Sequence, residues 1–422
     1  MFERGQITSY AACGLPYWVA GQVPRQDMLI ARTPRQHRAR GIDVRLGTEV
    51  VGIDPRASSV TVRTQDGQES IEGYDQLVIG TGALPVRPPI PGSQAPNVAT
   101  VHTVPGTQDL VDQLTRSGSA PRRAVVVGAG FIGIEMAEAF LDRGIAVTVI
   151  DQATHPMVSF DPDMGAVLAE SMADQGVACA FGQAVREVEL DEAGLAQAVL
   201  TDAGRYPCEL VVLALGVRPN TGIAIEAGLP VGDSGGLLTD RRQQVRDHED
   251  IWAAGDCVET YHRLLRTTVH MPLGTHANKQ GRVLGLNVAG EYATFPGIIG
   301  TAITKVGTAH LSRTGLTEAQ AAQAGFDAVA AKVQTSVIAG YMPNPGRMIT
   351  KVLAERGTGR LLGGQIIGDR VGAAKRIDTL AMAIWTGFTA EDLTGADLSY
   401  APPFSPTWDP VQTAARRLLP TI

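Results

Sequence analysis

The feature that most constrains the fold of this chain is a glycine-rich turn between two apolar strands. The apolar run 124–127 leads into Gly128-Ala129-Gly130-Phe131-Ile132-Gly133, and a helical pattern continues to Arg143. A second apolar strand then ends at Asp151. Strand, GxGxxG turn, helix, strand and acid in this order indicate a dinucleotide-binding βαβ unit. We expect the glycines Gly128, Gly130 and Gly133 to bind the pyrophosphate, and Asp151 to bind the adenosine ribose.

The acid at the end of the second strand predicts which dinucleotide binds. A carboxylate accepts a hydrogen bond from a ribose 2′-hydroxyl and repels a 2′-phosphate, so Asp151 favours NADH. NADPH is the alternative, because Arg143 or another nearby cation could compensate for the acid. A glycine turn in an unrelated α/β unit is the interpretation that would exclude both dinucleotides.

Other apolar strands end in small residues, where a ligand can approach the backbone closely. One of these strands precedes Gly80-Thr81-Gly82-Ala83, another precedes Gly216, and a third precedes Ala254-Gly255-Asp256. A helix is expected over 27–40 and another from Gly274, whereas antiparallel strands are expected within 300–311 and over 328–336.

Composition excludes several classes of function. The 36 lysines and arginines are spread along a chain of net charge −7, unlike the basic stripe of a nucleic-acid-binding protein. No apolar run reaches the ~20 residues of a membrane helix, and no signal-peptide pattern opens the chain. The cysteines Cys13, Cys179, Cys208 and Cys257 lack metal-ligand spacing, so we expect no metal site, no disulfide scaffold and a reducing cytoplasm.

Cys13 lies between Ala12 and a Gly14-Leu15-Pro16 turn. Such a residue is either a small buried hydrophobe or a thiolate stabilised by backbone N–H groups. No second cysteine occurs at 14–18, so no local disulfide can form. A redox-active Cys13 would therefore carry its oxidising equivalent as a mixed disulfide, a persulfide or a sulfenic acid. The basic run from Arg32 to Arg38 could face a phosphorylated small ligand or form a solvated helix face.

The ordered set of motifs resembles the single-cysteine pyridine nucleotide-disulfide oxidoreductases over nearly the whole chain. The set comprises Ser9-x-x-x-Cys13-Gly14-Leu15-Pro16-Tyr17, Gly80-Thr81-Gly82-Ala83, the Gly128 fingerprint, Ala254-Gly255-Asp256 and Tyr400-Ala401-Pro402-Pro403-Phe404-Ser405. Within this family the chain is most similar to coenzyme A disulfide reductases, whose relatives include NADH oxidases, NADH peroxidases and persulfide reductases. The resemblance implies a homodimeric flavoenzyme that passes electrons from NADH through FAD to Cys13 and so reduces coenzyme A disulfide or a related disulfide or persulfide.

The resemblance also implies roles for individual residues. The residues expected to bind FAD or NADH, besides the Gly128 fingerprint and Asp151, are Glu3, Arg4, Thr81, Gly82, Glu135, Gly216, Gly255, Asp256 and Ala277. Ser9 would assist Cys13, and Tyr341 and Tyr400 would reach the thiol-substrate site of the other subunit. Asp256 could instead be a helix N-cap, Glu135 an exposed helix carboxylate, and the two tyrosines core aromatics.

The implied fold class is α/β, with two nucleotide-binding Rossmann-like domains and an α+β C-terminal dimerisation domain. The expected domains are an FAD-binding domain in two parts, 1–98 and 219–292, an NAD(P)H-binding domain over 99–218, and the dimerisation domain over 293–422. The FAD-binding domain is expected to lack its first strand and helix, because no Gly-rich strand-turn-helix precedes Phe2-Glu3.

Two departures from the family leave alternatives open: the missing first unit of the FAD-binding domain and the residue before the cysteine. Coenzyme A enzymes commonly carry Asn before the cysteine, where this chain has Ala12. A second interpretation is an NADH oxidase or peroxidase in which Cys13 cycles through sulfenic acid. A third, from another class, is a catalytically silent nucleotide-binding protein.

Overall fold

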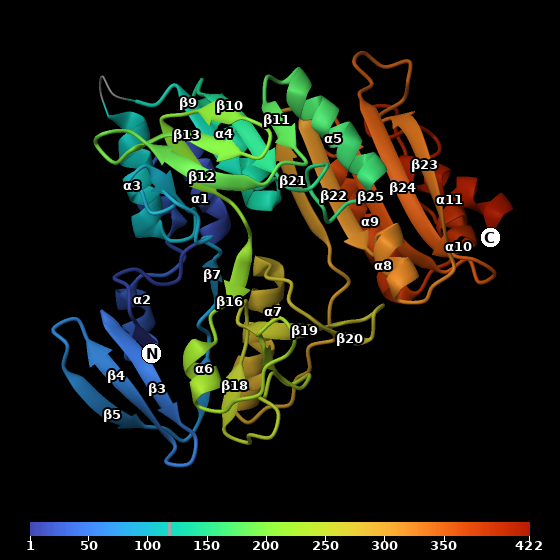
Figure 1. Ribbon diagram of the computed structural model, residues 1–422. Coiled ribbons are helices and arrows are strands. Elements are labelled where there is room, and N and C mark those ends of the chain that lie inside the picture. The colour runs from blue at the N-terminus through green and yellow to red at the C-terminus, as the bar shows by residue number, and fades with distance from the viewer. Residues whose placement is uncertain (117–119) are drawn as a thin grey trace. The chain divides into compact units, whose positions relative to one another are not determined.

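The computed structural model describes residues 1–116 and 120–422, which form two compact units, each assembled from separate stretches of the chain (Figure 1). Within the described residues, the first unit holds Met1–Val86, 100–116 and Gly216–Ile298. The second unit holds Arg87–Ala99, 120–215 and Ile299–Ile422.

The first unit consists of small sheets and of helices that range from three to 15 residues. Its strands are β1 (Phe2–Glu3), β2 (Arg45–Leu46), β3 (Thr48–Asp54), β4 (Ser59–Thr64), β5 (Glu69–Gly73), β6 (Leu77–Ile79), β7 (Ala83–Pro85), β16 (Val217–Pro219), β17 (Leu237–Leu238), β18 (Ile251–Ala253), β19 (Val258–His262) and β20 (Thr267–Val269). Its helices are η1 (Ala12–Gly14), α1 (Leu15–Ala20), η2 (Gln26–Leu29), α2 (Pro34–Arg38), α3 (Val104–Thr115), α6 (Gly222–Glu226) and α7 (Gly274–Val288).

Two apolar strands of the first unit place its glycine loops side by side. β6 and β18 pair in parallel, with Leu77 opposite Ile251 and Ile79 opposite Ala253. Ile79, Ile251 and Ala253 are buried in one apolar cluster. Because both strands run in the same direction, the loops that follow them begin at the same edge. The Gly80–Gly82 loop therefore lies beside Gly255 and Asp256.

The predicted helix over 27–40 is wrong. The segment instead forms a 3₁₀ turn, η2, and the five-residue helix α2. Thr33 and Gln36 form a capping box, and Pro34 stands in the first turn of α2. A proline at that position starts a helix but cannot continue one from upstream, because it lacks the N–H donor.

The second unit contains the larger sheets. Its strands are β8 (Val98–Ala99), β9 (Arg123–Val127), β10 (Ala146–Asp151), β11 (Ala178–Phe181), β12 (Val185–Leu190), β13 (Ala196–Thr201), β14 (Arg205–Pro207), β15 (Leu210–Leu213), β21 (Ala302–Val306), β22 (Ala309–Gly315), β23 (Ala328–Ser336), β24 (Arg347–Glu355) and β25 (Leu361–Gly368). Its helices are α4 (Phe131–Asp142), α5 (Pro162–Asp174), α8 (Glu318–Gln323), η3 (Ala374–Arg376), α9 (Ile377–Thr386), α10 (Ala390–Gly395), α11 (Pro410–Leu418) and η4 (Leu419–Thr421).

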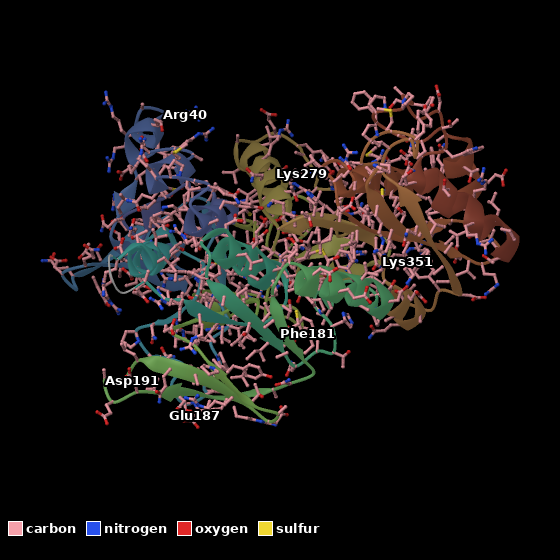
Figure 2. The ribbon with its side chains drawn as sticks, turned by 90° about the horizontal axis from the view of Figure 1, so that it is seen from above. Arg40, Phe181, Glu187, Asp191, Lys279 and Lys351 are labelled. Atoms are coloured by element: carbon pink, nitrogen blue, oxygen red, sulfur yellow. The ribbon has the colours of Figure 1, made fainter. Side chains whose placement is uncertain are left out.

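A five-stranded parallel sheet in the second unit carries the dinucleotide fingerprint. Its strand order is β11-β10-β9-β15-β8. All four residues of β15 and the last four of β9 are buried, as expected for strands that are covered on both faces. The sheet β12-β13-β14 adds an antiparallel layer, and Figure 2 shows Asp191 at the tip of its first hairpin.

The C-terminal part of the second unit is a five-stranded antiparallel sheet. Its order is β21-β22-β25-β24-β23, visible as the orange strands of Figure 1. The region predicted at 300–311 is split into β21 and β22 by a turn at Gly307, whose φ is 53°. Helix α11 packs on β23 and β24, and α9 packs on β22 and β25. The predicted α/β fold class with an α+β C-terminal part is confirmed.

Among the described residues, no helix is both long enough and apolar enough to cross a membrane.

Candidate active site

The three fingerprint glycines meet three different steric demands. Gly128 has a φ of 106°, and a β-carbon there would lie 2.4 Å from the carbonyl oxygen of Ala214. A β-carbon on Gly133 would lie 1.9 Å from the carbonyl oxygen of Gly128, so only glycine lets α4 approach the turn this closely. Gly130 faces open space, with no atom within 4 Å of such a β-carbon. That space gives a pyrophosphate access to backbone N–H groups at the start of α4.

Asp151 joins the end of β10 to the fingerprint turn. Its Oδ2 accepts a hydrogen bond from Ala129 N at 2.7 Å, and its Oδ1 accepts one from Ala153 N at 2.8 Å. The carboxylate is therefore held beside the turn, where an acid can also reach a ribose hydroxyl.

Glu135 lies on α4, two residues after the last fingerprint glycine. Its Oε1 accepts a hydrogen bond from Thr304 Oγ1 of β21 at 3.0 Å. Burial raises the pKa of Glu135 to about 7, although the Thr304 hydrogen bond opposes this, and the charge of Glu138 raises it further. Glu135 is half-buried and hydrogen-bonded to β21, so it is not an ordinary exposed helix carboxylate.

In the first unit, Asn220 closes the Gly80–Gly82 loop. Thr81 Oγ1 donates to Asn220 O at 2.6 Å, and Asn220 N donates to Gly82 O at 2.9 Å. A β-carbon on Gly80 or Gly82 would have no atom within 4 Å, and Gly82 has a φ of 69°. The loop is therefore fixed from one side and open on the other.

Asp256 follows β18 and faces three histidines. Burial raises the pKa of its carboxyl, while the charges of His270, His102 and His276 oppose the increase. Burial lowers the pKa of both His102 and His276. The described residues give the Asp256 carboxylate no hydrogen bond, although its carbonyl accepts one from His270 Nε2. The Asp256 side chain therefore does not cap a helix.

Helix α7 supports this corner. Gly255 N donates to Gln280 Oε1 at 2.9 Å, and Ala277 lies 3.6 Å from where a β-carbon on Gly255 would be. A half-buried carboxylate without a hydrogen bond, open backbone at Gly80 and Gly82, and the amino end of a 15-residue helix fit the polyol and phosphate groups of FAD. The residues that would hold FAD are Thr81, Gly82, Gly255, Asp256 and Ala277.

Cys13 is exposed and lies in the turn η1. Ala11 N donates to Leu29 O at 2.8 Å, and a β-carbon on Gly14 would lie 2.4 Å from Leu29 Cδ2. Leu15 and Trp18, both buried, anchor α1 directly after the turn. A β-carbon on Gly274, the first residue of α7, would lie 3.9 Å from Cys13 Sγ. The sulfur therefore lies at the amino end of α7, where helix N–H groups favour negative charge.

Ser9 lies four residues before the cysteine but directs its hydroxyl elsewhere. Its Oγ is 2.8 Å from His37 Nε2, and its φ is 54°. Its carbonyl accepts hydrogen bonds from Ala31 N and Arg32 N. Ser9 therefore shapes the turn and ties it to the basic segment before α2.

Glu3 and Arg4 follow the parallel pairing of β1 with β2. Glu3 Oε1 accepts a hydrogen bond from Gly5 N at 2.7 Å, and Arg4 Nη1 is 3.7 Å from Glu49 Oε1. Gly216 also belongs to the first unit, where its carbonyl accepts a hydrogen bond from Val86 N.

Tyr341 and Tyr400 are brought together in the second unit although 59 positions separate them. A hydrogen bond with Tyr400 raises the pKa of Tyr341. Their exposed fractions are 75% and 49%, and Phe404 close to Tyr400 in the chain is 75% exposed. The two tyrosines are therefore surface residues, and the interpretation as core aromatics is wrong.

Sequence reasoning missed several residues that shape these sites. Asn220, Gln280 and Thr304 each make the contacts described above from elements distant in the chain. Asn220 directly follows β16, so its position after a strand end was a usable signal. Nothing local marked Thr304 or Gln280 as partners.

Comparison with known proteins agrees with this arrangement. The family described as pyridine nucleotide-disulphide oxidoreductase matches residues 1–281, and its dimerisation domain matches 301–410. An NAD(P)H coenzyme A polysulfide/persulfide reductase of Pyrococcus horikoshii is 36% identical over 420 residues, covering 99% of this chain and 92% of that protein. An NADH oxidase of Methanocaldococcus jannaschii is 32% identical over 414 residues, covering 97% and 90%.

The structure of an NAD-dependent persulfide reductase from A. fulgidus superposes with a TM-score of 0.95 at 35% identity, covering all of this chain and 78% of that one. The predicted family, fold class and enzyme class are confirmed. The chain belongs to the pyridine nucleotide-disulphide oxidoreductase family and is an FAD-dependent NAD(P)H oxidoreductase.

Proposed function

We propose that this enzyme uses NADH to reduce coenzyme A disulfide, or the persulfide of a coenzyme A-like thiol, through Cys13. The observation that carries the proposal is that the exposed Cys13 lies at the amino end of α7, with no second cysteine nearby in the turn. FAD, when bound, supplies two-electron transfer between nicotinamide and sulfur.

The chemistry at Cys13 balances without a second protein thiol. The Cys13 thiolate attacks one sulfur of the substrate disulfide, the substrate S–S bond breaks, and one thiol leaves. Two electrons that originate in NADH then break the resulting mixed disulfide and release the second thiol. Overall, NADH and one proton are consumed, and one disulfide becomes two thiols. The α7 amino end stabilises the attacking thiolate in the first step and the leaving Cys13 thiolate in the second.

The basic segment beside the cysteine turn favours a phosphorylated thiol. Arg32, Arg35 and Arg40 are exposed, and none has an ion pair among the described residues. Hydrogen bonds from Ala31 N and Arg32 N to Ser9 O fix this segment next to the turn. Guanidinium groups bind phosphates well, so the phosphates of coenzyme A are suitable partners.

The remaining site roles follow from this function. The residues Glu3, Arg4, Thr81, Gly82, Gly216, Gly255, Asp256 and Ala277 would contact FAD, and Gly128, Gly130, Gly133, Glu135 and Asp151 would contact NADH. We expect the FAD-binding domain over 1–98 and 219–292, the NAD(P)H-binding domain over 99–218 and the dimerisation domain over 293–422. In a cytoplasmic homodimer, the exposed pair Tyr341 and Tyr400 would be covered by a second copy and would contact the thiol substrate.

Anaerobic stopped flow tests the substrate. Enzyme reduced with NADH should be reoxidised by coenzyme A disulfide within the turnover time and only slowly by oxygen. The Methanocaldococcus relative makes an oxidase the second candidate, and faster reoxidation by oxygen would establish it. A double variant, Arg32→Ala with Arg35→Ala, should raise KM for coenzyme A disulfide but not for pantethine, which lacks the nucleotide phosphates. Arg56→Ala, an exposed arginine in the β3–β4 turn, is the matched control.

A further inference from the structure

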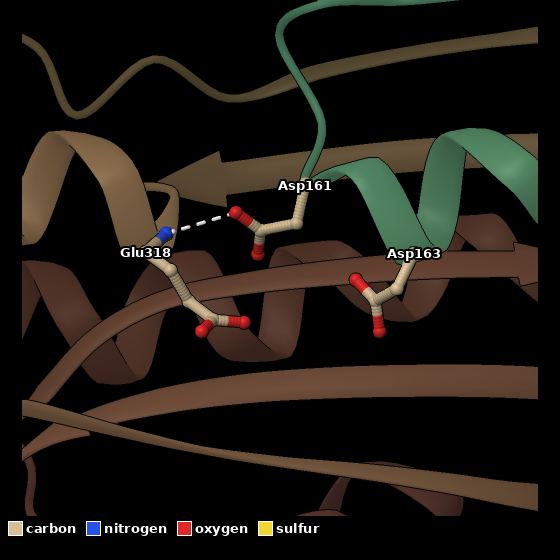
Figure 3. A group of neighbouring side chains, drawn as sticks. All are labelled: Asp161, Asp163 and Glu318. Atoms are coloured by element: carbon tan, nitrogen blue, oxygen red, sulfur yellow. Dashed lines mark hydrogen bonds between the residues drawn. The ribbon is translucent and has the colours of Figure 1, made fainter. Parts of the chain in front are cut away.

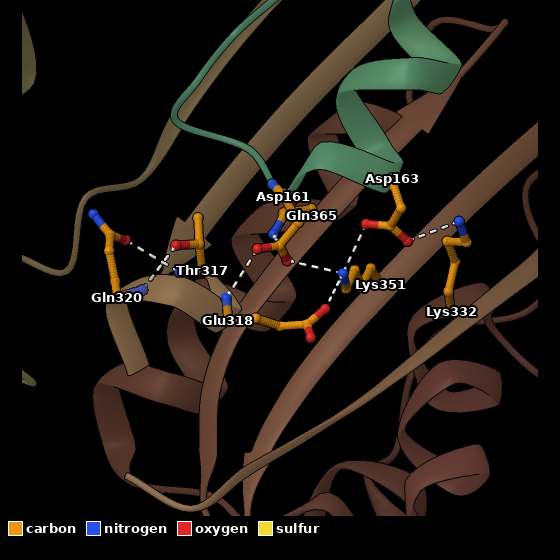
Figure 4. A network of polar contacts seen from close by, with 8 residues as sticks. All are labelled: Asp161, Asp163, Thr317, Glu318, Gln320, Lys332, Lys351 and Gln365. Atoms are coloured by element: carbon orange, nitrogen blue, oxygen red, sulfur yellow. Dashed lines mark hydrogen bonds and ion pairs between the residues drawn. The ribbon is translucent and has the colours of Figure 1, made fainter. Parts of the chain in front are cut away.

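Three carboxylates of the second unit converge at one point. Asp161, Asp163 and Glu318 each offer an oxygen, and these atoms lie within 4.8 Å of one another (Figure 3). Lys351 of β24 places its ammonium among them, 3.0 Å from Asp161 Oδ2, 2.7 Å from Asp163 Oδ1 and in contact with Glu318 Oε1 (Figure 4). The lysine side chain is only 5% exposed. Its ammonium is therefore the resident cation of the cluster.

Asp161 is the most enclosed member. It precedes α5, yet its side chain does not cap that helix. Its Oδ1 instead accepts a hydrogen bond from Glu318 N, the first residue of α8, at 2.9 Å. Gln365 of β25 donates to Oδ2 at 2.6 Å and accepts from Asp161 N at 2.9 Å. The carboxylate and the backbone N–H of Asp161 are thus bonded to the C-terminal sheet and to α8, whereas its carbonyl accepts from Met164 N and Gly165 N of α5.

The charges in this cluster stabilise one another. Burial would lower the pKa of Lys351, but its hydrogen bonds to Asp163, Glu318 and Asp161 outweigh burial and raise it. Burial would raise the pKa of Asp163, but Lys332 and Lys351 outweigh it and lower the pKa. Removal of Lys351 would therefore leave a buried carboxylate without its cation.

A short segment connects this cluster to the dinucleotide turn. Asp161 ends the stretch that begins at Asp151, and within it Met157 is buried with a φ of 55°. Met157 N donates to Ala129 O, between Gly128 and Gly130, at 2.8 Å, and Phe160 N donates to Met157 O at 2.8 Å. Arg313 of β22 donates to Ser159 O at 2.7 Å. A non-glycine residue in the left-handed region persists only where its surroundings hold it.

We propose that Lys351 and Asp161 are positioning residues for the adenosine half of the dinucleotide. By fixing the 157–161 segment to the C-terminal sheet, they maintain the hydrogen bond from Met157 N to Ala129 O. That contact in turn keeps Ala129 N in place to donate its hydrogen bond to Asp151. This inference rests on the proposed binding of NADH at the Gly128 turn, but it concerns residues that lie outside that turn.

The test is the affinity of the FAD-loaded full chain for ADP-ribose, measured by calorimetry without any disulfide substrate. Lys351→Ala should weaken ADP-ribose binding about tenfold and raise KM for NADH in dye reduction, while kcat and flavin content stay unchanged. Added propylammonium should restore affinity by replacing the missing cation. Lys332→Ala removes a neighbouring lysine that reaches Asp163 only, 41% exposed, and should leave ADP-ribose affinity unchanged.

Unchanged affinity in Lys351→Ala would overturn the inference, as would an equal loss in Lys332→Ala. If Lys351→Ala does not fold, Lys351→Arg is the second variant, because it keeps the charge but not the geometry. Its affinity for ADP-ribose should fall, and an unchanged affinity would overturn the inference. Failure of the wild-type chain to bind ADP-ribose would instead refute the proposed dinucleotide site itself.

Discussion

The two nucleotide-binding regions use glycine for different reasons. In the second unit, Gly128 and Gly133 are required by protein atoms that a β-carbon would meet at 2.4 and 1.9 Å. In the first unit, a β-carbon on Gly80 or Gly82 would meet nothing within 4 Å. The acids differ in the same way, because Asp151 accepts two backbone hydrogen bonds whereas the described residues give the Asp256 carboxylate none. The comparison indicates that packing within the protein fixes Gly128 and Gly133 in the second unit, whereas the Gly80–Gly82 loop of the first unit has open space beside it, as a bound cofactor would require.

The largest expected effect is on disulfide reduction, and it distinguishes the role of the Cys13 sulfur from the roles of the two nucleotide-binding regions. Cys13→Ser should lower the rate of disulfide reduction by at least about a thousandfold, because no other thiol lies in the turn. NADH-dependent dye reduction should stay close to wild type, since it needs only the nucleotide sites. Steady-state assays with both acceptors measure this, and Cys179→Ser, another exposed cysteine, is the control. Equal loss of both activities would refute the role of Cys13.

Alanine substitutions at Gly133 and Gly130 test whether a glycine is required by neighbouring protein atoms or by space for a ligand. Gly133→Ala should cost about 1–3 kcal/mol in the free energy of unfolding, because its methyl group would overlap the Gly128 carbonyl. Gly130→Ala should leave stability nearly unchanged but weaken NADH binding, since its methyl group would enter the space open to the pyrophosphate. Denaturant unfolding and NADH titration measure the two quantities. A similar loss of stability in both variants would contradict the steric difference between Gly133 and Gly130 within the fingerprint turn.

The acids sharpen the comparison further. Asp151→Asn should weaken NADH binding about tenfold and narrow its advantage over NADPH, because a charged hydrogen-bond acceptor is lost. Asp256→Asn should leave NADH binding intact and lower the flavin content of the purified protein. Titration with each nucleotide and the flavin absorbance are the measurements, and a shift of nucleotide preference in Asp256→Asn would contradict the assignment.

The smallest expected effect is a pH dependence at Glu135. Its pKa is raised by burial from 4.5 to about 7, so between these values the unfolded chain has released a proton that the folded chain keeps. Stability should therefore fall as the pH rises from about 4.5 to about 7. Glu135→Gln should flatten this slope in thermal melts, whereas Glu187→Gln, exposed on β12, should not. Equal slopes in wild type and Glu135→Gln would exclude the buried acid as the cause.

Sequence patterns predicted those parts of the sites that depend on local order. The strand, turn, helix and acid around Gly128 follow one another within 28 residues, so periodicity and glycine spacing locate them. The helix expected over 27–40 is wrong because α2 begins only after the N-cap Thr33, with Pro34 in its first turn. Three contacts join residues that are 59 or more positions apart in the chain. They are the hydrogen bonds between Tyr341 and Tyr400 and between Thr304 and Glu135, and the ion pair between Lys351 and Asp161. Such contacts depend on how sheets and helices pack, which no local pattern records.

The central claim is that electrons from NADH reach a disulfide through Cys13, and anaerobic NADH titration tests it most directly. FAD-loaded enzyme is first treated with coenzyme A disulfide and desalted, and flavin absorbance is followed during the titration. The wild type should take up one equivalent of NADH more than Cys13→Ser before the flavin is fully reduced, because the mixed disulfide at Cys13 accepts two electrons. Identical uptake by the two proteins would contradict the account.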